Sequence, residues 1–169
     1  MEHEGRGVGA APRGVSAAPT DETGVVVDAS VAIEWLVAEP GSHLAAGLLE
    51  GRPLHAPALM RIEAANALGV MGRRGVLTPD EADDALATLG RVPLASAPPG
   101  FDPVPRAVRL ARLLDHPVYD CVYLSLAVDL GRPVVTADRR FVAAAAAAHP
   151  DRALLVHSLN APAGPEMLQ

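Results

Sequence analysis

The sequence predicts an α/β domain with a mainly parallel central sheet of four or five strands, flanked by helices on both faces. Short apolar runs typical of buried strands alternate with longer segments of helical periodicity. At 169 residues the chain is long enough for one domain with its own core, and its only cysteine, Cys121, excludes an internal disulfide framework. Half of the residues are apolar but only 3% are aromatic, so the core should consist mostly of Val, Leu, Ile and Ala.

The two ends of the chain are predicted to lie outside this domain. Residues 1–22 are rich in Gly, Ala and Pro and lack periodicity, which is typical of a disordered tail, and residues 161–169 are expected to be a second tail. A single domain is therefore expected over residues 23–160. The sequence contains no recognisable signal peptide and no apolar run of membrane-spanning length, so we expect a cytoplasmic protein without membrane contacts.

The first half of the domain is predicted to contain two strands and four helices. Three β-branched residues that end at Asp28 indicate a buried strand. Each of the next two helices begins at a serine available as an N-cap, Ser30 and Ser42, and the longest helix is followed by Gly75, which suits a C′ position. The fourth begins at Thr78, with proline at its first position and acids in its first turn. We expect these segments at about 24–28, 30–40, 42–50, 54–57, 58–74 and 78–90.

The second half is predicted to contain three strands and three helices. Pro93 cannot donate to a central ladder, so the strand around it should lie at an edge of the sheet. The last helix contains an alanine run of very high helical propensity and is expected to end at Pro150. We expect these segments at 92–95, 104–114, 119–130, 134–136, 138–148 and 154–156.

Four acids lie at positions from which they can share one site. Asp28 and Asp138 follow two predicted strands, and Glu63 and Asp120 lie within apolar helical patterns. The carboxyl ends of neighbouring parallel strands converge, and ligands of open α/β sheets bind there. Four carboxylates in one cleft cannot all stay ionised without a cation. Oxygen ligands without a partnering Cys or His suit Mg²⁺ or Mn²⁺ rather than Zn²⁺.

Each acid also has a purely structural explanation. Asp28 and Asp138 precede helices and can serve as caps, while Asp120 suits the first turn of a helix. Glu63 can face solvent from the surface of its helix. None of the six histidines forms a helical ligand pair, so His116 and the others are expected to be structural or solvent-facing.

The charged residues exclude several functions. The formal charge of −6 argues against a broad basic surface for duplex DNA, and all fourteen basic residues are arginines. Without lysine, Schiff-base chemistry and a phosphate-loop lysine are excluded. Haloacid-dehalogenase-like phosphatases and response-regulator receivers usually need such a lysine, and the former also need an acid where this chain has Ser30.

Four segments together resemble the PIN-domain ribonucleases, and among them the VapC-type toxins of bacterial toxin–antitoxin pairs. They span about residues 24–158, in the order of that family. The segments are Val27-Asp28-Ala29-Ser30 with Trp35, Pro57-Ala58-Leu59 leading to Glu63-Ala64-Ala65-Asn66, Tyr119-Asp120-Cys121-Val122-Tyr123, and Thr136-Ala137-Asp138-Arg139-Arg140-Phe141.

The resemblance implies a three-layer PIN-like domain that hydrolyses RNA with a metal-activated water. The acids Asp28, Glu63, Asp120 and Asp138 would form the catalytic, Mg²⁺-binding set, with Mn²⁺ as an alternative ion. Ser30 and Thr136 would be polar neighbours of the metal or phosphate. Apart from the resemblance, Arg139 and Arg140 adjoin Asp138 and can either bind phosphates or form a solvated helix end, and Asn66 lies on the same helix face as Glu63 as a further candidate for an auxiliary contact. A homodimer and a cognate antitoxin are also implied.

Two alternatives share the fold but differ in biology. A stand-alone PIN-domain nuclease would process RNA without an antitoxin. A catalytically inactive PIN-like module would bind RNA or protein, and such modules usually lack one or more of the acids, whereas all four positions are filled here.

Overall fold

The structure is a computed structural model that describes residues 24–38, 41–148 and 155–160. Its five strands form one sheet in which every neighbouring pair is parallel, in the order β3-β2-β1-β4-β5. The strands are β1 (Val25–Val27), β2 (Leu54–His55), β3 (Leu94–Ala95), β4 (Val134–Thr136) and β5 (Val156–Ser158). The predicted α/β class and the edge position of β3 are confirmed.

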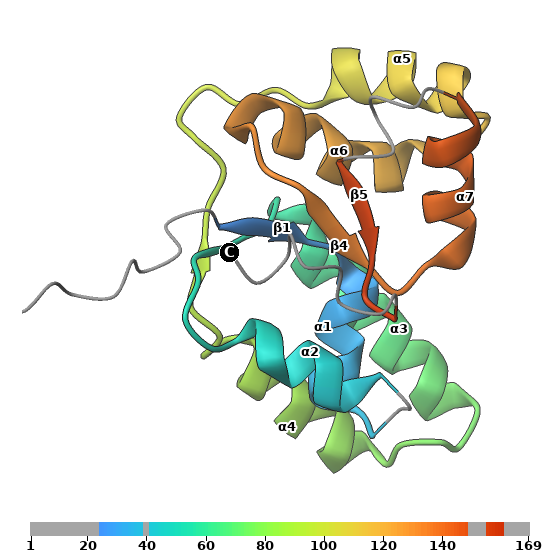
Figure 1. The fold of residues 1–169 in the computed structure, drawn as a ribbon. Helices are drawn as coiled ribbons and strands as arrows, with labels where there is room; N and C mark the ends of the chain where they lie inside the picture. The colour runs from blue at the N-terminus through green and yellow to red at the C-terminus, as the bar shows by residue number, and fades with distance from the viewer. Residues whose placement is uncertain (1–23, 39–40, 149–154, 161–169) are drawn as a thin grey trace, which may run out of the picture.

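Seven helices of the described residues cover the two faces of the sheet (Figure 1). They are α1 (Ala29–Leu36), α2 (Ser42–Leu48), α3 (Leu59–Arg73), α4 (Pro79–Leu89), α5 (Val104–Leu114), α6 (Val118–Leu130) and α7 (Arg139–Ala148). Helix α1 packs against α2, α3 and α4, whereas α5 packs against α6 and α7. Figure 1 shows the two groups on opposite sides of the strands, which gives the predicted three layers.

The core is built around β1, β4 and α6. All three valines of β1 are buried, as are Val134 and Val135 of β4. Seven consecutive residues of α6, from Cys121 to Ala127, are buried, because this helix is packed on several sides. No helix in the described part of the chain is both long and apolar enough to span a bilayer.

Three predicted element ends are wrong. The N-cap of α1 is Asp28 and not Ser30, since the Asp28 carboxylate accepts the free N–H groups of the first turn. Helix α1 ends at Leu36, earlier than the expected stop at Pro40, because Val37 adopts an extended backbone conformation. Strand β5 starts at Val156, two residues later than expected.

The predicted cap of α2 is also wrong, while two other predicted helix ends are confirmed. Gly41 precedes α2, and the Ser42 hydroxyl instead donates to the Val37 carbonyl oxygen at 3.0 Å. Thr78 caps α4 in a capping box with Glu81. Gly75 has a φ of 70°, a left-handed conformation that glycine adopts without strain, directly after the end of α3. The predicted tails and the expected stop at Pro150 lie outside the described residues.

Candidate metal centre

The register of the two central strands brings Asp28 and Asp138 to the same edge of the sheet. Val27 of β1 pairs with Val135 of β4, so both strands end at nearly the same level. The backbone N–H of Asp28 donates to the Val135 carbonyl oxygen at 3.2 Å, which extends the ladder by one bond. This edge is the carboxyl end of every strand, where ligand sites of such sheets form.

Both acids cap the helix that follows them. Oδ1 of Asp28 accepts the backbone N–H of Ser30 at 2.8 Å and of Val31 at 3.3 Å. Oδ1 of Asp138 accepts the N–H of Arg140 at 2.7 Å and of Phe141 at 3.4 Å. The capping explanation is therefore correct for both, but it does not exclude a ligand role, because a carboxylate has two oxygens and several acceptor sites.

Two hydroxyl groups join the ends of β1 and β4. Ser30 Oγ donates to Asp28, accepts the Ala137 N–H at 2.8 Å, and lies 3.4 Å from Thr136 Oγ1. Thr136 Oγ1 also accepts the N–H of Asp138 at 2.9 Å. Ser30 and Thr136 therefore hold the backbone and side chains around the two acids in one arrangement.

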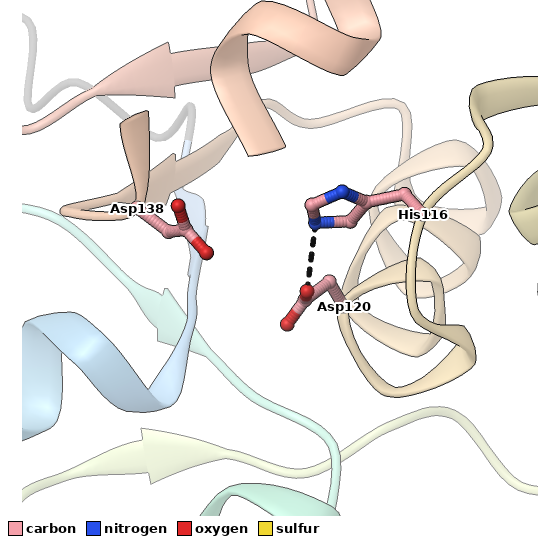
Figure 2. Close-up of side chains that lie close together, drawn as sticks. All are labelled: His116, Asp120 and Asp138. Carbon is pink, nitrogen blue, oxygen red and sulfur yellow. Dashed lines mark ion pairs between the residues drawn. The ribbon is translucent and has the colours of Figure 1, made fainter. Parts of the chain in front are cut away.

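Asp120 faces Asp138 across the site, and a histidine joins them (Figure 2). Ligand atoms of His116, Asp120 and Asp138 all lie within 4.8 Å of one another. Nε2 of His116 is 2.8 Å from Oδ2 of Asp120, one helical turn away in the sequence. From the sequence, His116 was expected to be structural or solvent-facing. Its spacing of four residues before Asp120 was the observation that could have identified it.

Glu63 reaches the same region from α3. The hydroxyl of Tyr123, on α6, donates to the Glu63 carboxylate, which links helices from opposite layers. The charge of Asp120 contributes to raising the pKa of Glu63, so these two carboxylates interact electrostatically. Glu63 and Asp28 lie outside the cluster of possible metal ligands formed by His116, Asp120 and Asp138.

Burial makes the acids harder to ionise. It raises the pKa of Asp28 to about 6, although the hydroxyls of Ser30 and Thr136 and nearby N–H groups oppose the change. Burial also raises the pKa of Glu63 and of Asp120; the negative charge of Asp138 adds to the shift of Asp120, while His116 opposes it. The hydrogen bonds and the histidine therefore compensate only in part for the cost of burying the charged carboxylates.

The donor set fits a divalent cation. Among the residues that the structure describes, none of the four carboxylates forms an ion pair with an arginine. The cluster therefore offers hard oxygen ligands and negative charge that no arginine of the described residues neutralises. A divalent ion would supply the missing charge and would favour the ionised form of each acid.

The auxiliary residues occupy more open positions. Asn66, Arg139 and Arg140 are exposed, and both arginines lie in the first turn of α7, directly after Asp138. Tyr119 is 63% exposed beside Asp120. Trp35 instead donates from Nε1 to the Ala45 carbonyl oxygen at 2.7 Å and packs against the core.

Known proteins resemble this chain in sequence and in fold. The family model "PIN domain" matches residues 25–147. Ribonuclease VapC12 of Mycobacterium tuberculosis, from strains CDC 1551 / Oshkosh and H37Rv, is 31% identical over 117 residues, which cover 69% of this chain and 88% of that protein. The crystal structure of PAE2754 from Pyrobaculum aerophilum has a TM-score of 0.52 at 22% identity, covering 75% of this chain and 88% of that one. This last likeness concerns the fold alone.

Proposed function

Because this chain belongs to the PIN-domain family and is of the VapC type, we propose that it is a Mg²⁺-dependent endoribonuclease and the toxin of a type II toxin–antitoxin pair. The observation that carries the proposal is the meeting of acids from distant parts of the chain at the carboxyl edge of the sheet. Asp28 and Asp138 are connected through Ser30 and Thr136, and Asp120 lies beside Asp138.

The four carboxylates would hold the ion, and neighbouring groups would orient them. Asp28, Glu63, Asp120 and Asp138 offer the oxygen donors that Mg²⁺ or Mn²⁺ prefers. When bound, the ion lowers the pKa of a water and neutralises charge on a phosphodiester oxygen. The hydroxyl of Tyr123 fixes the direction of the Glu63 carboxylate.

The proposed reaction is hydrolysis without a covalent enzyme intermediate. A bond forms between the water oxygen and phosphorus, the bond to the 3′ oxygen breaks, and that oxygen takes up a proton. The products are a 5′-phosphate and a 3′-hydroxyl. Ser30 is not assigned as a nucleophile, because no histidine of the described residues accepts a hydrogen bond from its hydroxyl.

Exposed arginines at the edge of the site would bind the RNA backbone. Arg139 and Arg140 can each make paired hydrogen bonds to phosphate oxygens, which lysine cannot do with the same geometry. Tyr119 offers an exposed ring on which a base can stack. These contacts are local, consistent with a net charge of −6 over the whole chain.

The same site would receive the antitoxin. A cluster of acids without an arginine partner among the described residues can accept a basic side chain from another protein. Such a contact would compete with the metal and with the RNA. We further propose that the nuclease is a homodimer, as the family resemblance implies.

The test is an RNA cleavage assay with and without Mg²⁺. We expect cleavage by the wild type only with the ion, and a loss of roughly a hundredfold or more in Asp28→Asn and Asp120→Asn, since a bound metal supplies several kcal/mol of stabilisation to the transition state. Asp83→Asn, the same change on the exposed surface of α4, is the control and should cleave normally. Equal cleavage by all four proteins would disprove the proposed site.

The toxin role needs a separate measurement. Expression of the wild type should stop bacterial growth, and expression of Asp120→Asn should not. A small gene directly upstream should restore growth when it is co-expressed. Cleavage without toxicity would instead indicate a stand-alone RNA-processing nuclease, and RNA binding without cleavage would indicate an inactive module.

A further inference from the structure

The imidazole of His116 lies against Asp120, and the proposed set of four carboxylates gives it no role. Its side chain is only 9% exposed, and Nε2 is buried without a hydrogen-bond partner among the described residues. Nε2 lies 2.8 Å from Asp120 Oδ2, which is an ion-pair distance when the ring is protonated, and the neutral ring leaves this nitrogen with no other polar partner among the described residues. A buried polar atom in this state is costly unless something else binds it.

The positions of the three side chains suit a shared ion. Figure 2 shows the His116 ring edge and the carboxylates of Asp120 and Asp138 around a common space, and one ligand atom from each lies within 4.8 Å of the others. Donors that each lie about 2.1 Å from one ion are roughly 3 Å apart when adjacent and about 4 Å apart when opposite. The 2.8 Å between Nε2 and Oδ2 corresponds to an adjacent pair.

The surrounding structure holds the ring in this direction. The imidazole stacks on Phe141, with ring centroids 5.1 Å apart and 12° between the planes. Phe141 is fully buried, and its backbone N–H donates to Asp138 Oδ1 at 3.4 Å. The same residue of α7 therefore positions both His116 and Asp138, as expected where a ligand is held by the groups around it.

We propose that His116 is a direct ligand of the divalent ion, so that the centre has one nitrogen donor besides its carboxylate oxygens. This inference rests on the proposed function, because it assigns a ligand to the ion that the nuclease would use. Imidazole suits transition metals, whereas Mg²⁺ prefers oxygen. The centre should therefore bind Mn²⁺ more tightly than an all-carboxylate site would, relative to Mg²⁺.

The decisive measurement is pulsed electron paramagnetic resonance of the full chain with one equivalent of Mn²⁺. A directly bound imidazole nitrogen modulates the echo, and labelling histidine with ¹⁵N changes the modulation. We expect this signature in the wild type and in His43→Gln, which alters an exposed histidine of α2. We expect it to be absent in His116→Phe, which keeps an aromatic ring against Phe141 but removes the nitrogen.

Binding titrations complete the test. In His116→Phe the dissociation constant for Mn²⁺ should rise by about tenfold or more. The constant for Mg²⁺ should change less, by about threefold at most, because Mg²⁺ gains little from a nitrogen donor. His116→Gln, a second variant with a smaller change in polarity, should give the same pattern, and melting curves without metal check that both variants fold.

The outcomes separate this inference from the proposed function. If the wild type binds Mn²⁺ without a nitrogen signature, His116 is not a ligand, and the carboxylate site still stands. A loss of affinity in the variants without a nitrogen signature would likewise overturn the ligand role, since it would show that His116 only orients Asp120. If the wild type binds neither Mn²⁺ nor Mg²⁺, both proposals are overturned.

Discussion

At the scale of single residues, Asp28 combines two tasks that oppose each other energetically. Its carboxylate caps α1, which stabilises the helix, but the residue is only 5% exposed, and this burial penalises the charge of the carboxylate. The effect of burial on the pKa of Asp28 is larger than that of the hydrogen bonds from Ser30 and Thr136, so the pKa rises to about 6. An ionised carboxylate at this buried position therefore lowers the stability of the metal-free protein.

The pH dependence of stability tests this balance. The pKa of Asp28 is about 6 in the folded protein and 3.8 in the reference state, so between these values the folded chain binds more protons than the unfolded chain. The wild type without metal should therefore lose stability as the pH rises from about 4 to 6, on the order of 2 kcal/mol from this group.

Asp28→Asn should remove this loss. The variant does not titrate at this position, and its side-chain oxygen can still cap α1. Urea unfolding in chelator should show it to be more stable than the wild type at pH 7.5, and no more stable at pH 4. A wild-type advantage at pH 7.5 would mean that the ionised carboxylate is stabilising in the folded state.

Tyr123 is the second residue with a specific task. Its hydroxyl donates to Glu63, and its ring is almost fully buried. Tyr123→Phe keeps the ring but frees the carboxylate, so RNA cleavage should fall by about tenfold, as expected for a lost hydrogen bond to a charged group. Asp83→Asn, a change at an exposed position of α4 outside the site, is the control. Unchanged kcat and KM in Tyr123→Phe would show that Glu63 needs no orientation.

At the scale of elements, short strands and helix starts place the acids. β1 and β4 have only three residues each, and both are followed by an acid that caps the next helix. Each of these acids is fixed on one side by a strand and on the other by backbone N–H groups. This double attachment holds the carboxylates without help from long loops.

The cap of α4 offers a contrast, because it stabilises a helix that contributes no acid to the site. Thr78 Oγ1 accepts the Glu81 N–H at 3.3 Å, and the Glu81 carboxylate accepts the Thr78 N–H at 2.7 Å. Thr78→Ala should lower the melting temperature by about 2–4 °C and leave RNA cleavage unchanged. Thermal unfolding and the cleavage assay test the two halves of this expectation, and a large loss of cleavage would show that α4 supports the site.

At the scale of the whole molecule, the balance of charge favours a cation. The chain has a formal charge of −6 and no lysine, and the described acids of the site have no arginine partner. A ligand that binds only the folded state stabilises it by mass action. Metal binding should therefore be visible as stability even without RNA.

Thermal or urea unfolding with added metal measures this effect. At a concentration about 100 times the dissociation constant, Mg²⁺ or Mn²⁺ should raise the free energy of unfolding by about 2.7 kcal/mol. The gain should be much smaller in Asp120→Asn and should persist in Asp83→Asn. An equal gain in all three proteins would indicate that the metal binds elsewhere.

The order and type of the elements could be predicted from sequence because their causes are local. Valine runs, helical periodicity and proline or glycine stops indicated five strands and seven helices in the described residues, and all are present. The errors lie at helix ends and at β5. At the start of α1, Asp28 and Ser30 were both candidates for the same backbone N–H groups, and only the three-dimensional arrangement decides between them.

The sequence by itself determined the α/β class, the two strand-end acids and the resemblance to PIN-domain ribonucleases. Only the tertiary structure decided which side chains meet. The Tyr123 hydroxyl of α6 meets the Glu63 carboxylate of α3, and His116 lies beside Asp120 and Asp138 with its ring packed on Phe141 of α7. Periodicity records which face of a helix is apolar. It does not record which distant helix lies against that face, because that depends on how all the buried surfaces pack together.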